Sequence, residues 1–444
     1  MGVRDMKSTA LRGILVLSPL LPLTACLAPQ QGTSADERIR NVENGLVRYT
    51  FDESFTMGQI VDFKRIDALP RFNILENMQN YKVPGVSVAV IDNFKIAWTK
   101  AYGVMDAGTN RAVTTETMFQ SGSTTKLLMA IVILRMAEEG KLDLDANINT
   151  YLKTWKVPQH PSGRMVTLRL LLTHRAGINR PGDGFETEPG SSPTLLQFLK
   201  GERPVLSDAV SFDNPPGTRL SYSNFGYLIM QYMLEDRFQT SFAELVEQYV
   251  FRPLRLESSF IEYPFPPQYA ARVIRPHDRE GKPSADDGLY SSALAQAGMI
   301  ATPSDWARIA CELMLASAGR SDTMLSQESV RAMFRTEADL NPAEFEGISG
   351  QGLGVFLFSE GQQQYFLHHG HNSPGANCVL IGSQTTGQGA VIMTNGMRGI
   401  PLSYQIVSSI SKEYGWDQDH EGMTRTAASR QHESTSADRT SAGA

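Results

Sequence analysis

The stretch SGSTTKLLMAIVILRMAEEG at residues 121–140 joins a short polar segment to a long apolar run. From Leu127 to Ala137 the only charged residue is Arg135, and Gly140 is a typical residue at the end of a helix. The pattern predicts an apolar helix over residues 123–139, with Ser123 and Lys126 at its N-terminal end.

Ser123 and Lys126 are three residues apart, so on a helix they share a face. A serine hydroxyl becomes a good nucleophile when a base takes its proton, and a lysine amine can do this once its pKa is lowered. A position near a helix N-terminus in a partly desolvated site lowers a lysine pKa. Taken alone, however, the motif favours the alternative of a helix-capping serine followed by a solvated lysine.

A second motif is Tyr222-Ser223-Asn224, which follows a Gly-containing loop and precedes an apolar helix starting near Phe225. A tyrosine beside a lysine ammonium can have a lowered pKa and carry protons, and an asparagine can hold a substrate amide or carbonyl. The alternative is a core tyrosine followed by an asparagine helix cap, and alone that alternative is favoured.

A third motif is HHGH at residues 368–371, at the end of a predicted strand over 364–367. A glycine lets a backbone approach a ligand closely, and an edge strand offers N–H groups to a carbonyl oxygen. Three histidines also suggest a metal, but on a strand only His369 and His371 share a face, and no nearby acidic or cysteine ligand completes a set. We therefore expect no metal site and no cofactor.

Strand patterns occupy both ends of the chain around a mostly helical middle, roughly residues 140–310. Near the N-terminal end, residues 86–91 and 94–104 read as a hairpin turning at 92–93, and the C-terminal end has strands over 353–358, 364–368, 377–382 and 390–394. This order predicts an α+β architecture in which both ends share one antiparallel sheet flanked by helices.

In this order the three motifs resemble those of the serine β-lactamase and penicillin-binding-protein superfamily, in particular its class C and family VIII esterase branch. Other segments also look like family segments: VPGV at 83–86, LLTHRAG at 171–177, RPL at 252–254 and AGMIAT at 297–302. The resemblance covers about residues 70–415.

The resemblance implies a β-lactamase/transpeptidase-like fold with Ser123 as the acyl-accepting nucleophile. Lys126 and Tyr222 would share general base and acid duty. The backbone N–H groups of Ser123 and His371 would form the oxyanion hole, each donor contributing about 2–4 kcal/mol. His174, in the LLTHRAG segment, would be structural.

The resemblance also places substrate-binding residues at Asn224, His368, His369 and Gly370. Class C β-lactamases usually carry Lys-Thr-Gly on the third strand, where this chain has His368 and His369. An unperturbed histidine is mostly neutral near pH 7, so the fixed positive charge that binds a carboxylate is absent. This departure favours neutral esters or amides over β-lactams and D-alanyl-D-alanine carboxylates. There is no Gly-x-Ser-x-Gly segment of the α/β-hydrolase type.

The chain has 444 residues and a formal net charge of −6, so it lacks the basic excess that attracts nucleic acid. Its size suits one large domain or two. Residues 1–25 combine a basic start with a short apolar run, as in a secretory signal. They end at LTAC, which resembles the bacterial lipobox and predicts lipidation of Cys26.

We accordingly divide the chain into a lipoprotein-type signal peptide (1–25), a tether and N-terminal segment (26–69), a serine hydrolase domain (70–415) and a disordered tail (416–444). Residues 27–45 are expected to be the flexible tether. The predicted location is the periplasmic side of a bacterial envelope, with the lipid as outer-membrane anchor. Cys311 and Cys378 read as buried thiols, and the sequence leaves their pairing open.

The leading hypothesis is an envelope-anchored esterase acting on a small-molecule or peptide acyl substrate. The alternatives are a D-alanyl carboxypeptidase or amidase, a weak β-lactamase, and a catalytically silent lipoprotein that binds peptidoglycan or another protein.

Overall fold

The computed structural model describes residues 33–48, 70–180, 185–285, 289, 292–341, 347–360 and 363–416. Contacts divide the chain into a unit of residues 1–34 and a unit of residues 35–444, and all described helices and strands belong to the second unit. The predicted signal peptide, Cys26 and residues 417–444 of the predicted tail lie outside the described residues.

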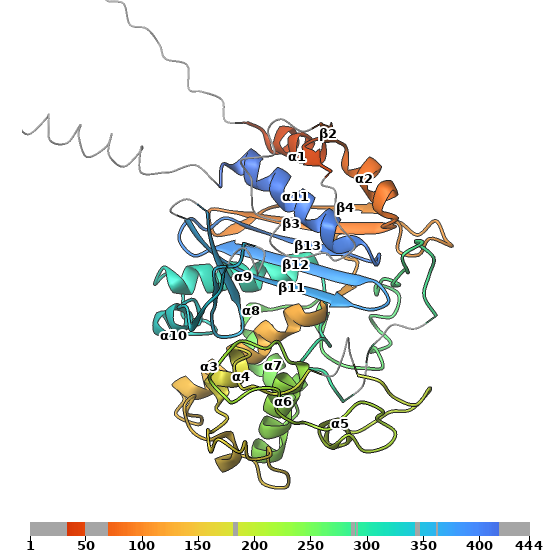
Figure 1. Ribbon diagram of the computed structural model, residues 1–444. Coiled ribbons are helices and arrows are strands. Elements are labelled where there is room, and N and C mark those ends of the chain that lie inside the picture. The colour runs from red at the N-terminus through yellow and green to blue at the C-terminus, as the bar shows by residue number, and fades with distance from the viewer. Residues whose placement is uncertain are drawn as a thin grey trace, which may run out of the picture. The chain divides into compact units, whose positions relative to one another are not determined.

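An antiparallel sheet of eight strands runs through the described part of the second unit (Figure 1). The strand order β4-β3-β13-β12-β11-β10-β9-β8 places β3, from the N-terminal half, beside β13, from the C-terminal end. The predicted α+β class, with one sheet shared by both ends of the chain, is thereby confirmed. The strands are β3 (Gly85–Asp92), β4 (Lys95–Gly103), β8 (Ala338–Asp339), β9 (Gly350–Gln351), β10 (Phe356–Glu360), β11 (Gln363–Asn372), β12 (Ala376–Ser383) and β13 (Gly389–Thr394).

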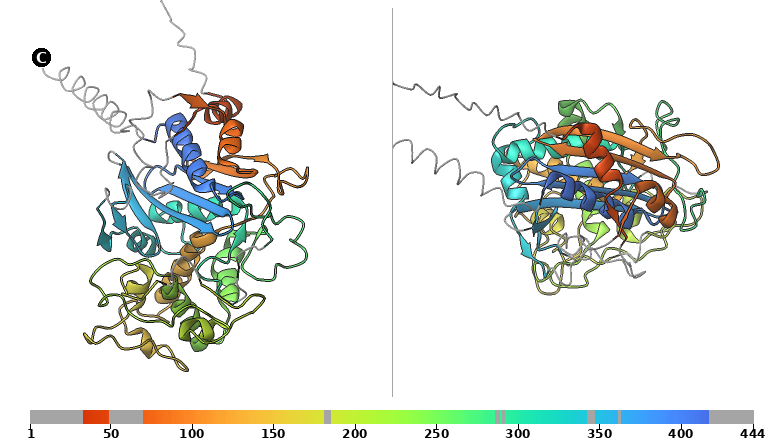
Figure 2. Two further views of the ribbon diagram at one scale, coloured as in Figure 1. Left: turned by 45° about the vertical axis from the view of Figure 1, so that its right-hand side comes forward. Right: turned by 90° about the horizontal axis from the view of Figure 1, so that it is seen from above.

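Helices cover both faces of this sheet (Figures 1 and 2). Alternate strand residues point to opposite faces, so Val379 and Ile381 join a core with α11, whereas Cys378 and Leu380 join a second core with α9 and α3. Helices α1 and α2 contact α11 on the first side. The bounds are α1 (Ala35–Glu43), α2 (Ile74–Tyr81), α9 (Pro303–Ser317) and α11 (Gly399–Tyr414).

The middle of the chain is mostly helical and surrounds α3, whose residues from Lys126 to Leu134 are all buried. A helix that is apolar all round has to lie inside a protein. The other elements are α4 (Leu168–Leu172), α5 (Leu195–Lys200), α6 (Asn224–Phe238), α7 (Phe242–Val246), α8 (Arg252–Leu254), α10 (Gln327–Met333), the 3₁₀ turns η3 (Gly122–Thr125) and η4 (Ile148–Thr150), and the π-helical turn η5 (Glu247–Phe251), with α3 itself at Lys126–Glu138. Two small sheets pair β1 (Leu46–Val47) with β2 (Arg71–Phe72), and β5 (Phe119–Gln120) and β6 (Ser259–Phe260) with β7 (Ile300–Ala301).

The turn η3 packs directly against the end of β11, and two glycines permit this contact. Gly122 has φ +52°, and a Cβ added there would lie 2.7 Å from the backbone nitrogen of His371. A Cβ added to Gly370 would lie 1.9 Å from the carbonyl oxygen of Ser121. Backbone-to-backbone packing of this kind has no room for a side chain, so glycine is required at both positions.

Several predicted boundaries differ from the structure. The hairpin between β3 and β4 turns at Asn93-Phe94, where both residues have positive φ, instead of at 92–93. Residues 35–43 of the predicted tether form α1, which contacts α11; its one buried residue, Val42, gives almost no apolar periodicity to read. The predicted tail begins at residue 416, but Trp416 is buried and its carbonyl accepts a 2.9 Å hydrogen bond from the Tyr365 hydroxyl. Strand β10 begins at Phe356 instead of residue 353, because the chain turns at Gly354 with φ +74°.

Cys311 and Cys378 are buried, as predicted, and the structure answers the question of pairing that the sequence left open, because both thiols are free. Burial raises the pKa of both thiols to about 12, so they are protonated at neutral pH. Within the described residues, no helix has the length and apolar character needed to cross a membrane.

We predict that Gly370→Ala destabilises the fold by about 1–3 kcal/mol, which is typical of overpacking. The substitution should also lower the activity of the protein. The added methyl group would also lie 2.8 Å from the backbone nitrogen of Ser123, so η3 has to move away from β11. Urea denaturation followed by far-UV circular dichroism measures the loss of stability.

Gly108→Ala is the matched control, since Gly108 is exposed and its added Cβ meets only the Asp106 carboxylate, at 3.3 Å. A Gly370→Ala protein as stable and active as this control would contradict the importance of the contact between η3 and β11.

Candidate active site

Ser123 and Lys126 meet where η3 passes into α3. Lys126 Nζ lies 2.9 Å from Ser123 Oγ, at hydrogen-bond distance. The residue at the N-terminal cap of α3 is Thr125, and its side chain makes no capping hydrogen bond. The alternative of a helix-capping serine with a solvated lysine is therefore wrong, and the two side chains are placed as a nucleophile and a base must be.

Side chains on both flanks of Ser123 fix η3 in place. The Trp306 indole donates a 2.8 Å hydrogen bond to Ser121 Oγ, and Thr125 Oγ1 accepts a 3.1 Å bond from the backbone N–H of Met299. Both partners come from the region of β7 and α9. The turn that carries Ser123 is thus held from the sheet side as well as by α3.

The Lys126 amine is completely buried. Its second hydrogen-bond partner is the carbonyl of Gln296, at 2.8 Å, and no carboxylate of the described residues forms an ion pair with it. Burial lowers the pKa of Lys126 well below its ordinary value, because the charged ammonium would lose its hydration without gaining a counter-ion. The predicted lowering is confirmed in direction, and desolvation is its cause.

Tyr222 lies close to Lys126, and its ring is held by His174. The two rings stack with centroids 4.1 Å apart, and Lys126 Nζ lies 5.1 Å from the centre of the tyrosine ring. His174 has φ +54°, and its Nδ1 accepts a 3.2 Å hydrogen bond from the backbone N–H of Ser223. His174 therefore positions the YSN motif from two directions, in agreement with its predicted structural role.

The predicted lowering of the Tyr222 pKa is not what the structure shows. Burial raises this pKa, and a hydrogen bond with Ser123 offsets the effect only in part. The expectation assumed a lysine ammonium beside the phenol, but a buried amine with a lowered pKa supplies no such charge. Tyr222 is therefore a neutral phenol at neutral pH, and its first role can only be that of a proton donor.

Asn224 is the first residue of α6, and the capping residue is Ser223, which makes no side-chain capping bond to the helix. Ser223 Oγ instead donates to the carbonyl of Asn179 at 2.7 Å. Asn224 Oδ1 is buried without a hydrogen-bond partner in the described part of the chain. An orphaned polar atom costs about 1–3 kcal/mol, so its presence calls for an explanation such as a ligand group that donates to it.

The HHGH segment forms the last part of β11 and extends beyond its pairing with β10, which ends at Leu367. The first half of β11 is thus interior, and its last five residues, which include the HHGH segment, offer the predicted edge. His368 is buried, His369 is partly exposed with Nδ1 buried and unpartnered, and His371 is exposed with Nδ1 2.6 Å from Asn377 Oδ1.

Two backbone nitrogens meet at the contact between η3 and β11. Positions of ideal Cβ atoms place the nitrogen of His371 beside Gly122 and the nitrogen of Ser123 beside Gly370. These are the two N–H groups predicted to form the oxyanion hole, and the fold brings them to the same junction.

The sequence did not reveal two further groups around Lys126. The carbonyl of Gln296 accepts a hydrogen bond from its amine, and the centre of the Tyr227 phenol ring lies 5.4 Å from Nζ. A sequence does not show which backbone carbonyl a distant side chain will contact. Tyr227 follows Tyr222 by five residues, but nothing in its position distinguishes it from an ordinary core residue.

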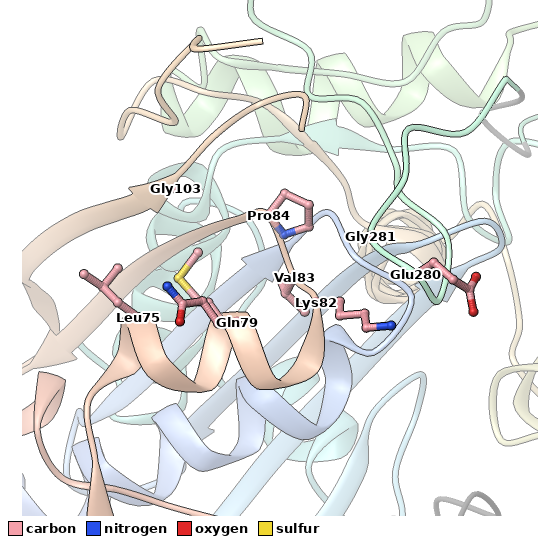
Figure 3. A pocket seen from close by; sticks show the side chains of 9 residues that line it. Leu75, Gln79, Lys82, Val83, Pro84, Gly103, Glu280 and Gly281 are labelled. Carbon is pink, nitrogen blue, oxygen red and sulfur yellow. The ribbon is translucent and has the colours of Figure 1, made fainter. Parts of the chain in front are cut away.

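Two other kinds of site were considered, a metal site and a surface hollow. Among the described residues, no three histidine, cysteine or carboxylate side chains converge as metal ligands. A hollow of about 400 Å³ lies beside α2 and is lined by residues that include Leu75, Lys82, Pro84 and Glu280 (Figure 3). None of the active-site residues described in this subsection lines it.

Comparison with known proteins gives a family match over most of the chain. The model of the family described as Beta-lactamase matches residues 72–404. Penicillin-binding protein 4 of Amycolatopsis lactamdurans is 32% identical over 190 residues, which cover 43% of this chain and 47% of that protein. The chain thus spans less than half the length of the first curated relatives it matches.

Solved structures show the same fold. The octameric penicillin-binding protein homologue from Pyrococcus abyssi has a TM-score of 0.66 at 22% identity, covering 77% of this chain and 76% of that one. D-amino acid amidase from Ochrobactrum anthropi SV3 has a TM-score of 0.61 at 21% identity, covering 77% and 97%. The predicted β-lactamase/transpeptidase-like fold is confirmed, whereas the narrower likeness to the class C and family VIII esterase branch stays a prediction.

We predict that Lys126→Met abolishes turnover but makes the protein more stable at neutral pH. The pKa of the folded amine lies below the unfolded value, so the unfolded chain binds more protons between the two values. Wild-type stability therefore rises with pH in this range, by up to about 1.4 kcal/mol per pH unit, and is lost as the pH falls. Urea unfolding at pH 7, 8 and 9 measures this slope.

Methionine carries no titrating amine, so the variant should lack the contribution of Lys126 to the slope. Lys95→Met, at an exposed lysine, should retain the wild-type slope. Equal slopes in wild type and Lys126→Met would mean that the buried amine keeps an ordinary pKa.

Proposed function

The chain belongs to the beta-lactamase family of serine hydrolases, and from that premise we propose that it cleaves ester bonds of uncharged acyl substrates through an acyl-Ser123 intermediate. The observation that carries the proposal is the 2.9 Å contact between Ser123 Oγ and a fully buried lysine amine. A neutral amine at that distance can accept the hydroxyl proton as the oxygen attacks, which a solvated lysine cannot do at neutral pH.

Acylation follows from these positions. Lys126 takes the proton of Ser123 as Oγ forms a bond to the substrate carbonyl carbon, and the carbonyl oxygen becomes an oxyanion. The N–H groups of Ser123 and His371 stabilise that oxygen. Tyr222 then gives its proton to the leaving alcohol oxygen as the ester C–O bond breaks, and the Lys126 ammonium restores the tyrosine proton.

Deacylation uses the same groups in the opposite direction. Water attacks the acyl carbonyl and gives its proton to the neutral amine of Lys126. Ser123 Oγ leaves as the carbonyl re-forms and is reprotonated from the Lys126 and Tyr222 pair. His174 keeps the phenol in place through both steps, since its ring stacks on the tyrosine.

The preference for uncharged substrates is supported by two buried histidines of β11. Burial lowers the pKa values of His368 and His369, the latter to about 4, so both are neutral at pH 7. Neither histidine therefore gives β11 a positive charge that could bind a carboxylate. The unpartnered Asn224 Oδ1 suits an N–H in the acyl part of a substrate.

A second candidate is an amidase or carboxypeptidase acting on D-amino-acid peptides, with weak β-lactamase activity as a further possibility. It is favoured by the similarity to a penicillin-binding protein and by the acceptor atom of Asn224. The catalytically silent scaffold is disfavoured, because a buried amine without a counter-ion destabilises the fold and has no use in a pure binder.

The test is intact-mass spectrometry of residues 27–444 after exposure to a fluorophosphonate and, separately, to a penicillin. We expect one fluorophosphonate adduct, mapped to Ser123, and none in Ser123→Ala. The Tyr222→Phe protein should form an acyl-enzyme that clears about 100-fold more slowly with a p-nitrophenyl ester, since it lacks the phenolic proton.

A penicillin adduct as well would support the peptidase or β-lactamase alternative. Absence of both adducts in folded protein, or a folded and active Ser123→Ala protein, would contradict the proposed chemistry. An unchanged steady-state rate in Tyr222→Phe would remove the proposed role of the phenol.

We also propose that Cys26 carries a lipid that holds the enzyme at the periplasmic side of a bacterial envelope, in the outer membrane. The support is the LTAC segment at residues 23–26 behind a basic and apolar leader. Cys26→Ser should move the protein from the membrane fraction to the soluble periplasmic fraction, because the anchor is lost. Continued fractionation with membranes would count against lipidation.

A further inference from the structure

The end of β11 that carries the proposed oxyanion donor has a neighbouring strand on one side only. Pairing with β10 ends at Leu367, whereas pairing with β12 continues to Asn372. Such a strand end lacks half of the ladder hydrogen bonds that fix a backbone inside a sheet. The N–H of His371 therefore needs other contacts if it is to stay aimed at a substrate oxygen.

Asn377 lies directly opposite His371 on β12 and contacts its ring. The two residues are register partners, and His371 Nδ1 lies 2.6 Å from Asn377 Oδ1. Contacts between the side chains of opposite residues are a usual means of stabilising a sheet. Asn377 is completely buried and His371 is exposed, so this hydrogen bond runs from the core of the sheet to the strand end beside η3.

The neighbours of Asn377 determine which of its atoms faces the histidine. Its Nδ2 donates to the carbonyl of Gly396 at 2.7 Å and to Thr394 Oγ1 at 3.0 Å. A carbonyl oxygen can only accept, so the amide nitrogen faces Gly396 and the amide oxygen faces His371. His371 Nδ1 is then the donor, in the neutral and in the protonated ring alike. Gly399, the first residue of α11, packs so closely that a Cβ added to it would lie 2.4 Å from Asn377 Nδ2.

A second contact ties the same strand end to the chain that leads into η3. Asn372 Nδ2 donates to Gln120 Oε1 at 3.0 Å, and Gln120 is the last residue of β5, shortly before Ser123. The two backbone N–H groups of the proposed oxyanion hole thus belong to segments that side chains hold against each other. Asn377 supplies the hold on His371 itself.

We propose that Asn377 is a positioning residue of the oxyanion hole: by holding the His371 ring from β12, it fixes the direction of the His371 backbone N–H. This inference rests on the proposed acyl-Ser123 mechanism and adds to it a buried residue that touches no substrate. The ring serves as a rigid link, so another side chain at position 371 that keeps a donor near the place of Nδ1 should also serve.

Loss of the link should affect the developing oxyanion above all. The N–H of His371 stays in the chain, but a hydrogen bond weakens steeply when the donor no longer points at the acceptor. Removal of one oxyanion donor lowers kcat by about 10²–10³-fold in other acyl-transfer enzymes. A misdirected donor should therefore cost about tenfold or more in the acylation of an ester.

The test compares p-nitrophenyl acetate with p-nitrophenyl thionoacetate, in which sulfur replaces the carbonyl oxygen. Sulfur is a weak hydrogen-bond acceptor, so acylation by the thionoester depends less on the oxyanion hole. We expect Asn377→Leu to lower kcat/KM at least tenfold for the oxygen ester and less than threefold for the thionoester. Leucine has a shape similar to that of asparagine, so it leaves little room for a water to replace the amide.

Asn77→Leu is the matched control for the loss of a buried amide. Asn77 is also completely buried, its Oδ1 accepts from Arg48 Nε at 2.7 Å, and its Nδ2 donates to Gln405 Oε1 at 2.8 Å. This residue lies on α2 and contacts no part of the site. The control should lose stability in urea, as Asn377→Leu does, but keep the wild-type ratio of the two kcat/KM values.

Two substitutions at the exposed position 371 test the link even if Asn377→Leu fails to fold. His371→Leu keeps the backbone N–H but loses the ring, and it should lower the ratio at least tenfold. His371→Asn keeps a donor near the place of Nδ1 and should keep the ratio within about threefold. If both side chains act through one contact, the His371→Leu/Asn377→Leu protein should show no further fall.

Three results would overturn the inference while leaving the acyl-enzyme mechanism in place. The first is a wild-type ratio in a folded Asn377→Leu protein or in His371→Leu. The second is a further, multiplicative fall in the double variant, and the third is an equal fall in the Asn77→Leu control. Hydrolysis of neither ester by the wild-type protein, together with no fluorophosphonate adduct, would instead remove the proposed function itself.

Discussion

The burial of the Lys126 amine is the constraint on which the account of this site depends. The amine has Ser123 Oγ and one backbone carbonyl as partners, and no described carboxylate balances it. Its neutrality makes it a base and removes the reason for a tyrosinate at Tyr222, while burial lowers the pKa values of His174 and His368. The site is thus built around an uncharged lysine, at a cost in stability that an unselected fold would not retain.

The second requirement is the close contact of η3 with β11. It brings Ser123, the proposed nucleophile, to a strand from the C-terminal part of the chain, and two glycines make room for it. The sheet itself joins β3 to β13, so both ends of the chain belong to the sheet that carries β11, whose end meets η3 at the proposed oxyanion hole. The fold therefore fixes the backbone parts of the site, while α3 and α6 supply the side chains that handle protons.

Much of this was predictable because the responsible patterns are local. The apolar run after Lys126 and a hairpin turn within one residue of the observed Asn93-Phe94 turn can be read from consecutive residues, and the three motifs carry their own spacing. What could not be predicted depends on distant groups: the Gln296 carbonyl, the stacking of His174 on Tyr222, and the direction of the Tyr222 pKa. Helix α1 was missed because it buries a single side chain, and packing onto α11 stabilises it more than any local pattern.

The most direct test of the central claim is the pH dependence of the rate at which a fluorophosphonate reacts with Ser123, measured between pH 5 and 10 by quenched-reaction mass spectrometry. If Lys126 is the neutral base, the rate rises with pH, levels off well below the ordinary lysine pKa of 10.5, and is lost in Lys126→Met. A rate that keeps rising about tenfold per pH unit up to pH 10 would show that the amine is protonated at neutral pH, and would contradict the account.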